Sequence, residues 1–392
     1  MEHDPGAMLR RQEALNRGYS DDEIRRLYTR GEWQRIGRGA YLSASMYSAL
    51  GEEERHRFLI DSTVHAVSDD AVLSHQSAAV VYGLPLWKTP LDRVHVTRNR
   101  LGGGRIKRRT TVHCAPIGEH VAVVDGHSLT LPARTVIDLA RTLPFEQAVV
   151  LGDAAVRRFG ISREDLDAEL ARAARRHGVD AARRVVRFVS GRSESVGESR
   201  SRVMLSSAGL PAPSQQGEVF EPGGRRIGRV DFHFDGIVLG ETDGRVKYGR
   251  LLKPGQSPGD AVFAEKQRED VLRDLGFQVV RWTWDDLGSP GLVAERVRRA
   301  FARAGSPRGW VTQAPPPVRR AAYGAVAIAA PFLGSRCTSR ARKAVREPRS
   351  SAATRRRSDS ASGWSVSGFP TGPARRRGCA RRVWVQGRVP RT

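Results

Sequence analysis

Hydrophobic periodicity runs through the first 305 residues of this 392-residue chain and is lost beyond them. The remainder contains Pro315-Pro316-Pro317 and arginine triplets at 355–357 and 375–377 among scattered Ser, Gly and Ala. Such a segment buries too little apolar surface to fold, so we expect a disordered basic tail over 306–392. The rest is long enough for two or three domains with separate cores.

The formal net charge of +24 is concentrated in the same tail. Residues 306–392 carry 19 Lys and Arg against Glu347 and Asp359, whereas residues 1–305 carry 47 basic and 40 acidic residues. The tail could add non-specific affinity for phosphates. The same composition also arises when a GC-rich stretch is translated in the wrong frame, so no function is based on it. The mildly basic body permits a polyanion partner without requiring one.

The sequence predicts a cytoplasmic protein without a membrane partner. Cys114, Cys337 and Cys379 cannot form a disulfide framework, and no CxxC pair suggests zinc. The N-terminus, MEHDPGAMLRRQ, has no apolar stretch typical of a signal peptide. The most apolar run, residues 321–333, is too short to span a bilayer.

Residues 1–50 show the element order of a small winged-helix DNA-binding domain. Ser20 and Glu23 form the pattern of a capping box, the helix that they open ends at Gly31, and a hairpin over 33–42 follows. A recognition helix and a basic hairpin tip would face a duplex. Alternatively, the arginines only keep a small helical cap solvated. The candidate DNA-binding residues of this domain are Arg25, Arg26, Arg30, Arg35 and Arg38.

Residues 51–190 predict a mixed α/β middle region. Helical patterns occupy 52–68, the segment after Ser74 and most of 133–189, and strand patterns occupy 93–98, 110–117 and 120–131. We consider five of the histidines in this region as ligands, but they do not lie at metal-ligand spacings, so we interpret them as structural or exposed. We find no catalytic constellation in this region. The five histidines are His75, His95, His113, His120 and His127.

Residues 191–305 predict a compact α/β domain. A helix over about 194–208 is followed by three strand patterns, a helix and a final strand, which is the order α-β-β-β-α-β. The fold class expected for the chain is therefore α/β and multidomain.

A group of acids within RVDF…GETDGRVKY is the main candidate for chemistry. Asp231 interrupts an apolar strand, where an unpaired carboxylate is costly without a partner or a metal. Glu241 and Asp243 are two residues apart and so share one face of a strand. Lys247 follows closely. Carboxylates on adjacent strand ends with a nearby base suit Mg²⁺, or Mn²⁺, in phosphodiester hydrolysis.

The register of the hairpin tests this convergence. A two-residue turn at Asp235-Gly236 would place Asp231 opposite Gly240 and Glu241 on the wrong face. Convergence therefore requires a connection of odd length or a bulge.

The acids could instead belong to an exposed hairpin, paired with Arg229, Arg245 or Lys247. Neighbouring residues favour a site: Glu198 lies on the preceding helix, and Lys266 and Arg268 lie on the following one.

The stretch ESR…RVDF…GETDGRVKY…EKQREDVLRDLGFQVVRWTWDDL resembles the domain of unknown function related to very-short-patch-repair endonucleases. The resemblance covers about 195–290 and implies a restriction-endonuclease-like, PD-(D/E)XK fold. It implies that Asp231 and Glu241 are metal ligands, that Asp243 is a further acidic site residue and that Glu198 is the helix-borne acid. Lys266 and Arg268 would flank the site, Lys266 as a catalytic candidate and Arg268 as a DNA-binding residue.

One position departs from the general pattern, in which a lysine follows the second acid by two residues. That position here is Asp243, so either Lys247 or Lys266 has taken over the role, or activity is altered or lost.

The front of the chain is similar to the AbiEi-type antitoxins of type IV toxin–antitoxin systems. The similarity rests on the helix start at Ser20, the hairpin GEWQRIGRGAY (31–41) and LSHQSAAVVYGLP (73–85). It implies a winged-helix transcriptional autoregulator, with a toxin protein or a second copy of the chain as a further partner.

Three functions remain open from the sequence. The first is a Mg²⁺-dependent endonuclease that binds double-stranded DNA through a winged helix. The second is an antitoxin-like regulator whose nuclease fold only binds DNA. The third is a nuclease that acts only with a partner protein. Fold alone does not choose among them.

Overall fold

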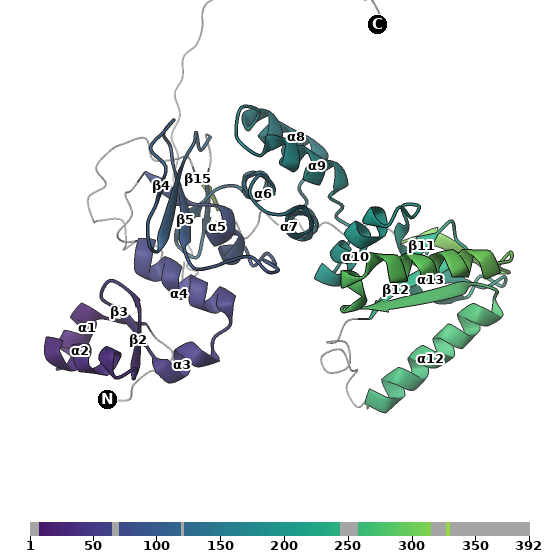
Figure 1. Cartoon of the computed structure of the whole chain (residues 1–392), viewed down its shortest axis with the longest axis horizontal. Helices are drawn as coiled ribbons and strands as arrows, with labels where there is room; N and C mark the ends of the chain where they lie inside the picture. The colour runs from purple at the N-terminus through teal and green to yellow at the C-terminus, as the bar shows by residue number, and fades with distance from the viewer. Residues whose placement is uncertain (1–7, 65–69, 119–120, 244–257, 315–326, 330–392) are drawn as a thin grey trace, which may run out of the picture. The chain divides into compact units, whose positions relative to one another are not determined.

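The computed structural model describes residues 8–64, 70–118, 121–243, 258–314 and 327–329. These residues form a mixed α/β protein with three β-sheets (Figure 1). Each sheet belongs to one stretch of the chain, apart from one strand added from far downstream. We refer to residues 8–50, 51–190 and 191–314 as the N-terminal, middle and C-terminal regions.

The N-terminal region is a pair of helices followed by a hairpin. Ser20 and Glu23 make both hydrogen bonds of the predicted capping box at the start of α2. Ile24, Trp33 and Tyr41 belong to the small core of this region. The elements are β1 (Leu9–Arg10), α1 (Arg11–Asn16), α2 (Asp21–Thr29), β2 (Trp33–Gly37), β3 (Ala40–Ser43) and α3 (Ala44–Ala49), with strand order β1-β3-β2.

The middle region combines a seven-stranded sheet with helices. The strand order is β15-β8-β9-β4-β5-β7-β6, and β5 and β7 pair in parallel with Thr97 opposite His113. The elements are α4 (Glu52–Val64), β4 (Ala71–Leu73), α5 (His75–Val81), β5 (Val94–Arg98), β6 (Arg105–Ile106), β7 (Thr110–Cys114), β8 (Val121–Val124), β9 (His127–Leu129), α6 (Pro132–Ala140), α7 (Phe145–Phe159), α8 (Arg163–Arg172), α9 (Val179–Phe188) and β15 (Ala327–Ala329).

The C-terminal region is a five-stranded mixed sheet with order β13-β12-β11-β10-β14. Its elements are α10 (Val196–Ser207), β10 (Ser214–Phe220), β11 (Arg226–Phe234), β12 (Val238–Asp243), α12 (Pro258–Asp274), β13 (Gln278–Thr283), a 3₁₀ turn (Asp286–Gly288), α13 (Pro290–Arg303) and β14 (Trp310–Gln313).

Two apolar clusters hold helices on opposite faces of this sheet. Phe232 and Trp282 belong to the cluster that includes residues of α10 and α13, whereas Leu239 and Leu272 belong to the cluster beneath α12. Alternate residues of β12 and β13 therefore face different helices, as the period of a strand requires. Figure 1 shows α12 across the sheet from α13.

The predicted order α-β-β-β-α-β is present in the C-terminal region, and α13 and β14 follow it. β14 lies within residues 306–392, for which we predicted no regular structure, and it pairs with β10. Its alternating apolar signal is only four residues long. β15 also falls within the predicted tail, and it pairs with β8. The rest of the predicted tail, except residues 306–314 and 327–329, lies outside the described residues.

The start of α5 departs from expectation in one detail. Ser74 stands at the N-cap as predicted, but its side chain makes no capping hydrogen bond. Its hydroxyl accepts a hydrogen bond from Thr97 Oγ1 at 2.8 Å and lies 3.0 Å from His75 Nδ1. The side chain is therefore used in the core of the middle region.

None of the helices formed by the described residues is both long and apolar enough to cross a membrane.

Candidate active site

The connection between β11 and β12 brings two of the predicted acids to the same place. Phe234 pairs with Val238 and Phe232 pairs with Gly240, so the loop has three residues, Asp235 to Ile237. The predicted connection of odd length is confirmed. One residue beyond the last pair, Asp231 stands across from Glu241, and Asp231 Oδ2 accepts a hydrogen bond from the Thr242 amide at 2.9 Å.

Glu198 approaches the same strand end from the first turn of α10. Ser195 is the N-cap, and its hydroxyl lies 2.9 Å from Glu198 Oε1. Glu198 Oε2 accepts hydrogen bonds from the Glu194 amide at 2.8 Å and from Gln216 Nε2 at 2.6 Å. Burial and then the charge of Asp231 raise the pKa of Glu198 to about 7. Asp231 is therefore close enough for its charge to disfavour ionisation of Glu198.

Glu241 faces the α12 side of the sheet and is held by two arginines. Its oxygens lie 2.5 Å from Arg268 Nη2 and 2.7 Å from Arg281 Nη2. Burial raises the pKa of Glu241, and both guanidinium groups act in the opposite direction. Arg281 stands opposite Glu241 in the parallel pairing of β12 and β13.

The same arginines bind further acids. Arg281 lies 3.2 Å from Asp243 and 2.9 Å from Glu269. Glu265 pairs with both Arg268 and Arg281, whose hydrogen bonds outweigh its burial and lower its pKa to about 2. Arg268 and Arg281, with Glu241, Asp243, Glu265 and Glu269, form what we call the arginine–carboxylate network.

The remaining predicted residues lie apart from this network or outside the described residues. Lys266 is exposed on α12 and makes no ion pair with any described residue. Lys247, and Arg245 of the exposed-hairpin interpretation, lie outside the described residues. Arg229, the other partner in that interpretation, pairs with Glu194 at 2.5 Å.

Carboxylate oxygens are the donors that Mg²⁺ prefers, but in this conformation they do not converge on one point. Within the described residues, no three of these acids place their oxygens within 4.8 Å of one another. A magnesium ion holds its ligands at about 2.0–2.1 Å. The donor chemistry therefore suits the ion, whereas the present positions do not form a finished site, because Glu241 is turned toward Arg268 and Arg281.

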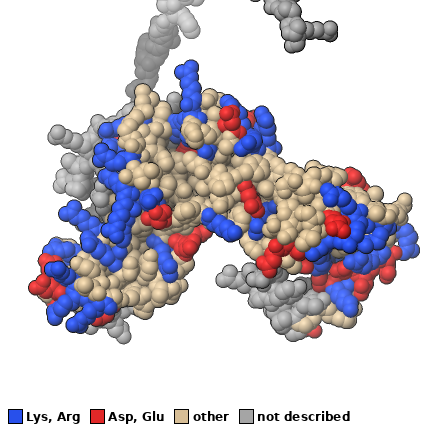
Figure 2. Space-filling model, in the orientation of Figure 1, with Lys and Arg blue, Asp and Glu red and all other residues tan. Residues whose placement is uncertain are grey.

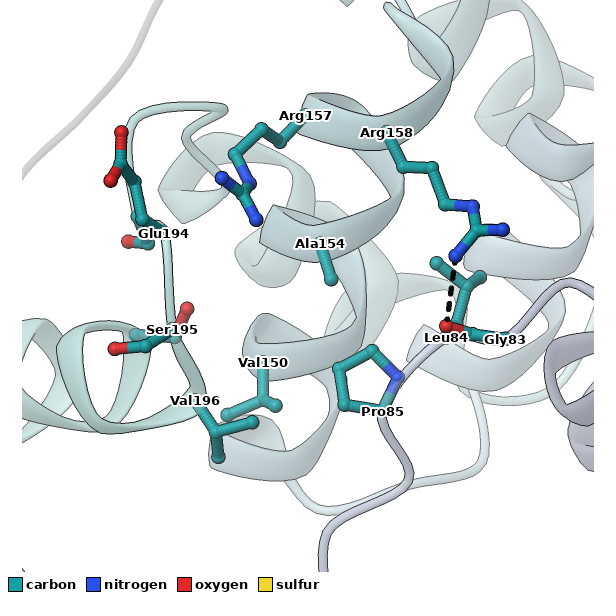
Figure 3. A pocket seen from close by; sticks show the side chains of 12 residues that line it. Gly83, Leu84, Pro85, Val150, Ala154, Arg157, Arg158, Glu194, Ser195 and Val196 are labelled. Carbon is teal, nitrogen blue, oxygen red and sulfur yellow. Dashed lines mark hydrogen bonds between the residues drawn. The ribbon is translucent and has the colours of Figure 1, made fainter. Parts of the chain in front are cut away.

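A cavity of about 510 Å³ lies beside the N-terminus of α10 but does not include the acids. Arg157 of α7 and the segment from Ser193 to Val196 line it from different sides (Figure 3). Asp231, Glu241 and Glu198 are not among its lining residues. It therefore adjoins the candidate site through Glu194 and Ser195, which contact Glu198, but the three acids do not line it.

The predicted DNA-contacting arginines of the N-terminal region are all exposed, and none forms an ion pair with a described residue. Arg35 lies over the ring of Tyr28, with its guanidinium carbon 5.9 Å from the ring centroid. The arginines of this set are Arg25, Arg26, Arg30, Arg35 and Arg38.

A second basic segment, the loop 98–109 around β6, was not singled out from the sequence. It carries exposed Arg105, Lys107 and Arg108 beside Leu101 and Ile106, which are 94% and 72% exposed. The charge run RNRLGGGRIKRR was the available signal. Over the C-terminal region, by contrast, basic and acidic side chains lie intermixed (Figure 2).

Sequence reasoning also missed a cluster of three histidines. His75, His95 and His113 place ring nitrogens within 4.8 Å of one another in the middle region. They come from α5, β5 and β7, so their separations along the chain do not follow a ligand-spacing pattern. Only the parallel pairing of β5 with β7 brings them together.

The fold and the site define a mixed α/β protein with an acidic site on its C-terminal sheet. No family model matches the chain. The chain is 31% identical over 189 residues to the uncharacterized proteins MT2308 and Rv2248 of Mycobacterium tuberculosis, strains CDC 1551 / Oshkosh and ATCC 25618 / H37Rv. The match covers 48% of this chain and 67% of each relative. The chain belongs to the same family as these two proteins, whose names state no function.

The structure is also similar to the crystal structure of the RV2827C protein from Mycobacterium tuberculosis. The identity is 15%, and the match covers 50% of this chain and 76% of the other. The TM-score of 0.33 is too low to support an argument about function.

Proposed function

We propose that the chain is a cytoplasmic DNA-binding protein whose C-terminal region is a restriction-endonuclease-like domain that hydrolyses DNA phosphodiester bonds with Mg²⁺ or Mn²⁺. The observation that carries the proposal is the three-residue connection between β11 and β12, which stands Asp231 across from Glu241. Glu198 reaches the same strand end from α10. The three-residue connection thus puts Asp231 and Glu241 in register on the hairpin, and Glu198 lies close enough to Asp231 for the two charges to interact.

A divalent ion bound between Asp231 and Glu241 would supply Lewis acidity and a positive charge next to the scissile phosphate. The chain's own residues have two tasks. Asp231 is positioned by the Thr242 amide, so its carboxylate is oriented before any ligand arrives. Glu241 must leave Arg268, and that guanidinium, still held by Glu265, is then available to a phosphate oxygen.

DNA contact is proposed for the N-terminal region as a winged helix. Its five arginines are exposed and lack ion-pair partners among the described residues, so they bring positive charge to a duplex without first breaking a salt bridge. The basic loop 98–109 adds a second surface of the same charge. A toxin protein or a second copy of the chain is a further partner implied by the antitoxin resemblance.

Plasmid cleavage tests the enzymatic proposal. Purified full-length protein is incubated with supercoiled plasmid with Mg²⁺, with Mn²⁺ and with EDTA. We expect metal-dependent nicking that falls by at least about 100-fold in Asp231→Asn and in Glu241→Gln, because each removes a ligand charge. Asp270→Asn is the matched control, since Asp270 is an exposed acid of the same domain. Cleavage that persists in both site variants contradicts the assignment.

A regulator without nuclease activity is the second candidate, and the arginine–carboxylate network favours it. Both oxygens of Glu241 are occupied by arginines, and Asp243 stands where the general pattern has a lysine. This candidate requires that no form of the protein cleaves DNA. It also requires that Asp231→Asn and Glu241→Gln retard a fragment of the chain's own promoter as well as the unchanged protein does.

Salt dependence tests the proposed DNA surface of the N-terminal region. The double variant Arg35→Ala, Arg38→Ala should weaken duplex binding and reduce the slope of log K against log salt by about 0.9 for each phosphate that the protein no longer neutralises. The pair Arg298→Ala, Arg299→Ala on α13 removes the same charge from another region and should leave the slope unchanged. Equal effects of the two pairs would show that only net charge matters.

A further inference from the structure

The histidine cluster of the middle region has an ordered geometry. His95 Nδ1 lies 3.1 Å from His113 Nε2, and the rings of His75 and His113 stack with centroids 3.7 Å apart. His75 is buried at 4% exposure. The three histidines lie at the start of α5 and on the parallel strands β5 and β7. Figure 1 labels α5 and β5.

The backbone at His75 has an unusual conformation that places its ring in the cluster. Its φ of +50° lies in the left-handed region, which residues with a side chain seldom adopt. Such conformations persist only where interactions with surrounding residues hold the backbone in place, and they are concentrated at functional sites. Here the surroundings are Ser74, whose amide bonds the His95 carbonyl at 3.0 Å, and Thr97, whose hydroxyl bonds Ser74 Oγ at 2.8 Å.

A neighbouring hydroxyl group contacts one of the imidazole rings, since His75 Nδ1 lies 3.0 Å from Ser74 Oγ. A hydrogen bond of this kind to a ring nitrogen fixes ring orientation and tautomer in metal centres. The Ser77 hydroxyl accepts a hydrogen bond from the backbone amide of His95 at 2.8 Å and so holds the backbone of β5 at this point.

We propose that His75, His95 and His113 bind one first-row transition-metal ion of the zinc class. Imidazole nitrogens suit this class of ion rather than Mg²⁺. Zinc holds nitrogen at about 2.0–2.1 Å, which places tetrahedral ligand atoms roughly 3.3 Å apart. The three ligand nitrogens already lie within 4.8 Å of one another. Because an imidazole lone pair lies in the plane of its ring, the stacked rings of His75 and His113 must rotate out of their parallel arrangement to point at one ion.

Two of the three histidines, His75 and His113, also line a cavity suited to an anion. This cavity of about 630 Å³ is lined as well by four arginines, with Asp138 among them. Asp138 is buried and lies 2.8 Å from Arg134, 3.2 Å from Arg141 and 3.9 Å from Arg176. One carboxylate is therefore shared by three arginines, which leaves the lining of the cavity with an excess of positive charge. Three protein ligands with an open position are typical of zinc sites that bind an exogenous ligand. An oxyanion such as phosphate is the class of ligand that this cavity fits. The four arginines are Arg134, Arg141, Arg175 and Arg176.

Cobalt titration of the full-length, EDTA-treated protein tests the metal site. We expect one Co²⁺ per chain with the intense visible bands of a four-coordinate site, displaced by Zn²⁺. His95→Gln and His113→Gln should each weaken binding by more than about 100-fold, since removal of an outer partner alone costs roughly 10–100-fold. His127→Gln is the matched control, because His127 lies on β9 of the same sheet, 3.1 Å from Asp61 and outside the cluster.

Three further measurements keep the result decisive. Circular dichroism establishes that each variant is folded, and a rise in the melting temperature of the unchanged protein with Zn²⁺ reports binding without any variant. Asp231→Asn must leave the cobalt spectrum unchanged, because it alters only the acidic site. Inorganic phosphate should shift the cobalt bands, and Arg175→Ala should weaken that shift.

Stoichiometric loss of the cobalt signal in Asp231→Asn would assign the ion to the C-terminal acids and overturn the proposal. Wild-type affinity in both His95→Gln and His113→Gln would overturn it as well. A protein that binds neither Co²⁺ nor Zn²⁺ has only a hydrogen-bonded histidine core at this place. The absence of a phosphate effect would remove the anion from the proposal and leave the metal.

Discussion

The C-terminal sheet and the middle sheet each carry a cluster of titratable side chains, but the side chains are ion-paired in the first cluster and uncharged in the second. In the C-terminal sheet the acids Glu241, Asp243 and Glu265 are matched by Arg268 and Arg281, so ionised groups neutralise one another. In the middle sheet, burial lowers the pKa of His75, His95 and His113, so these groups are neutral near pH 7. One cluster is stabilised by ion pairing and the other by the absence of charge.

The difference has consequences for what each cluster binds. Ionised carboxylates already paired with arginine accept a cation only after a competitor is displaced. Neutral imidazoles present lone pairs without needing to lose a proton first. We therefore expect the acidic site to be selective and dependent on rearrangement, and the histidine site to be available without displacement of a competing cation.

The largest expected effect comes from removing the central arginine of the network. Arg281→Ala leaves Glu241, at 8% side-chain exposure, with one cation instead of two. It also removes an ion-pair partner of Asp243 and one of the two ion-pair partners of Glu269. Breaking a buried pair costs about 3–5 kcal/mol, so we expect the C-terminal region to lose about 3 kcal/mol of stability in urea unfolding.

Two comparisons sharpen this result. Arg299→Ala removes an exposed pair with Glu295 and should cost less than about 0.5 kcal/mol. Mg²⁺ should raise the melting temperature of Arg281→Ala more than that of the unchanged protein, because the ion replaces the missing positive charge. If Arg281→Ala unfolds at the same urea concentration as Arg299→Ala, the network does not stabilise the sheet.

The acidic site could be predicted in part from the sequence, because most of its acids lie on one hairpin. Asp231, Glu241 and Asp243 are separated by few residues, and the period of a strand and the parity of the loop decide which of them share a face. Arg281 was overlooked, although it resembles Asp231 in one respect. It is a charged residue inside an apolar strand, and such a residue needs a partner.

The histidine cluster could not be predicted from the sequence, because it depends on the pairing of strands β5 and β7. His95 and His113 are neighbours only through the parallel alignment of β5 with β7, which a sequence does not specify between strands joined by a long connection. The left-handed backbone of His75 has no residue signature, since glycine is absent there. The order of the longer helices and strands was predicted because capping residues and periodicity are local signals, whereas the short strands β4, β6 and β15 were not predicted.

A smaller expected effect is the pH dependence of folding stability that the raised pKa of Glu198 causes. This pKa is about 7 in the folded protein against an ordinary 4.5, so the folded state binds the proton more tightly than the unfolded state does. The stabilisation is fully present below pH 4.5 and is lost as the pH rises through 7, an amount of about 3 kcal/mol at most. Glu198→Gln stays neutral and keeps acceptors for the Glu194 amide.

The measurement is the stability difference between Glu198→Gln and the unchanged protein from pH 5 to pH 8. The variant should gain on the unchanged protein as the pH rises and reach a constant advantage above about pH 7.5. Asp231→Asn should reduce this gain, because the charge of Asp231 contributes to the raised pKa. A difference that is flat across this range contradicts the placement of Glu198 beside Asp231.

The smallest expected effect is the acid sensitivity of the histidine cluster in metal-free protein. Burial is the main cause that lowers the pKa of His95 from 6.5 to about 3. Between pH 6.5 and pH 3, therefore, His95 is protonated in the unfolded state but not in the folded state. Stability is therefore fully present above pH 6.5 and declines as the pH falls, by about 2 kcal/mol for this residue at pH 5.

The variant His95→Gln cannot take up that proton. Its stability should therefore fall less steeply between pH 6.5 and pH 5 than that of the unchanged protein, as measured by urea unfolding after EDTA treatment. His127→Gln, outside the cluster, should keep the original slope. If His95→Gln keeps it too, His95 is protonated in the folded state, and the contrast between a neutral histidine cluster and an ionised acidic one fails.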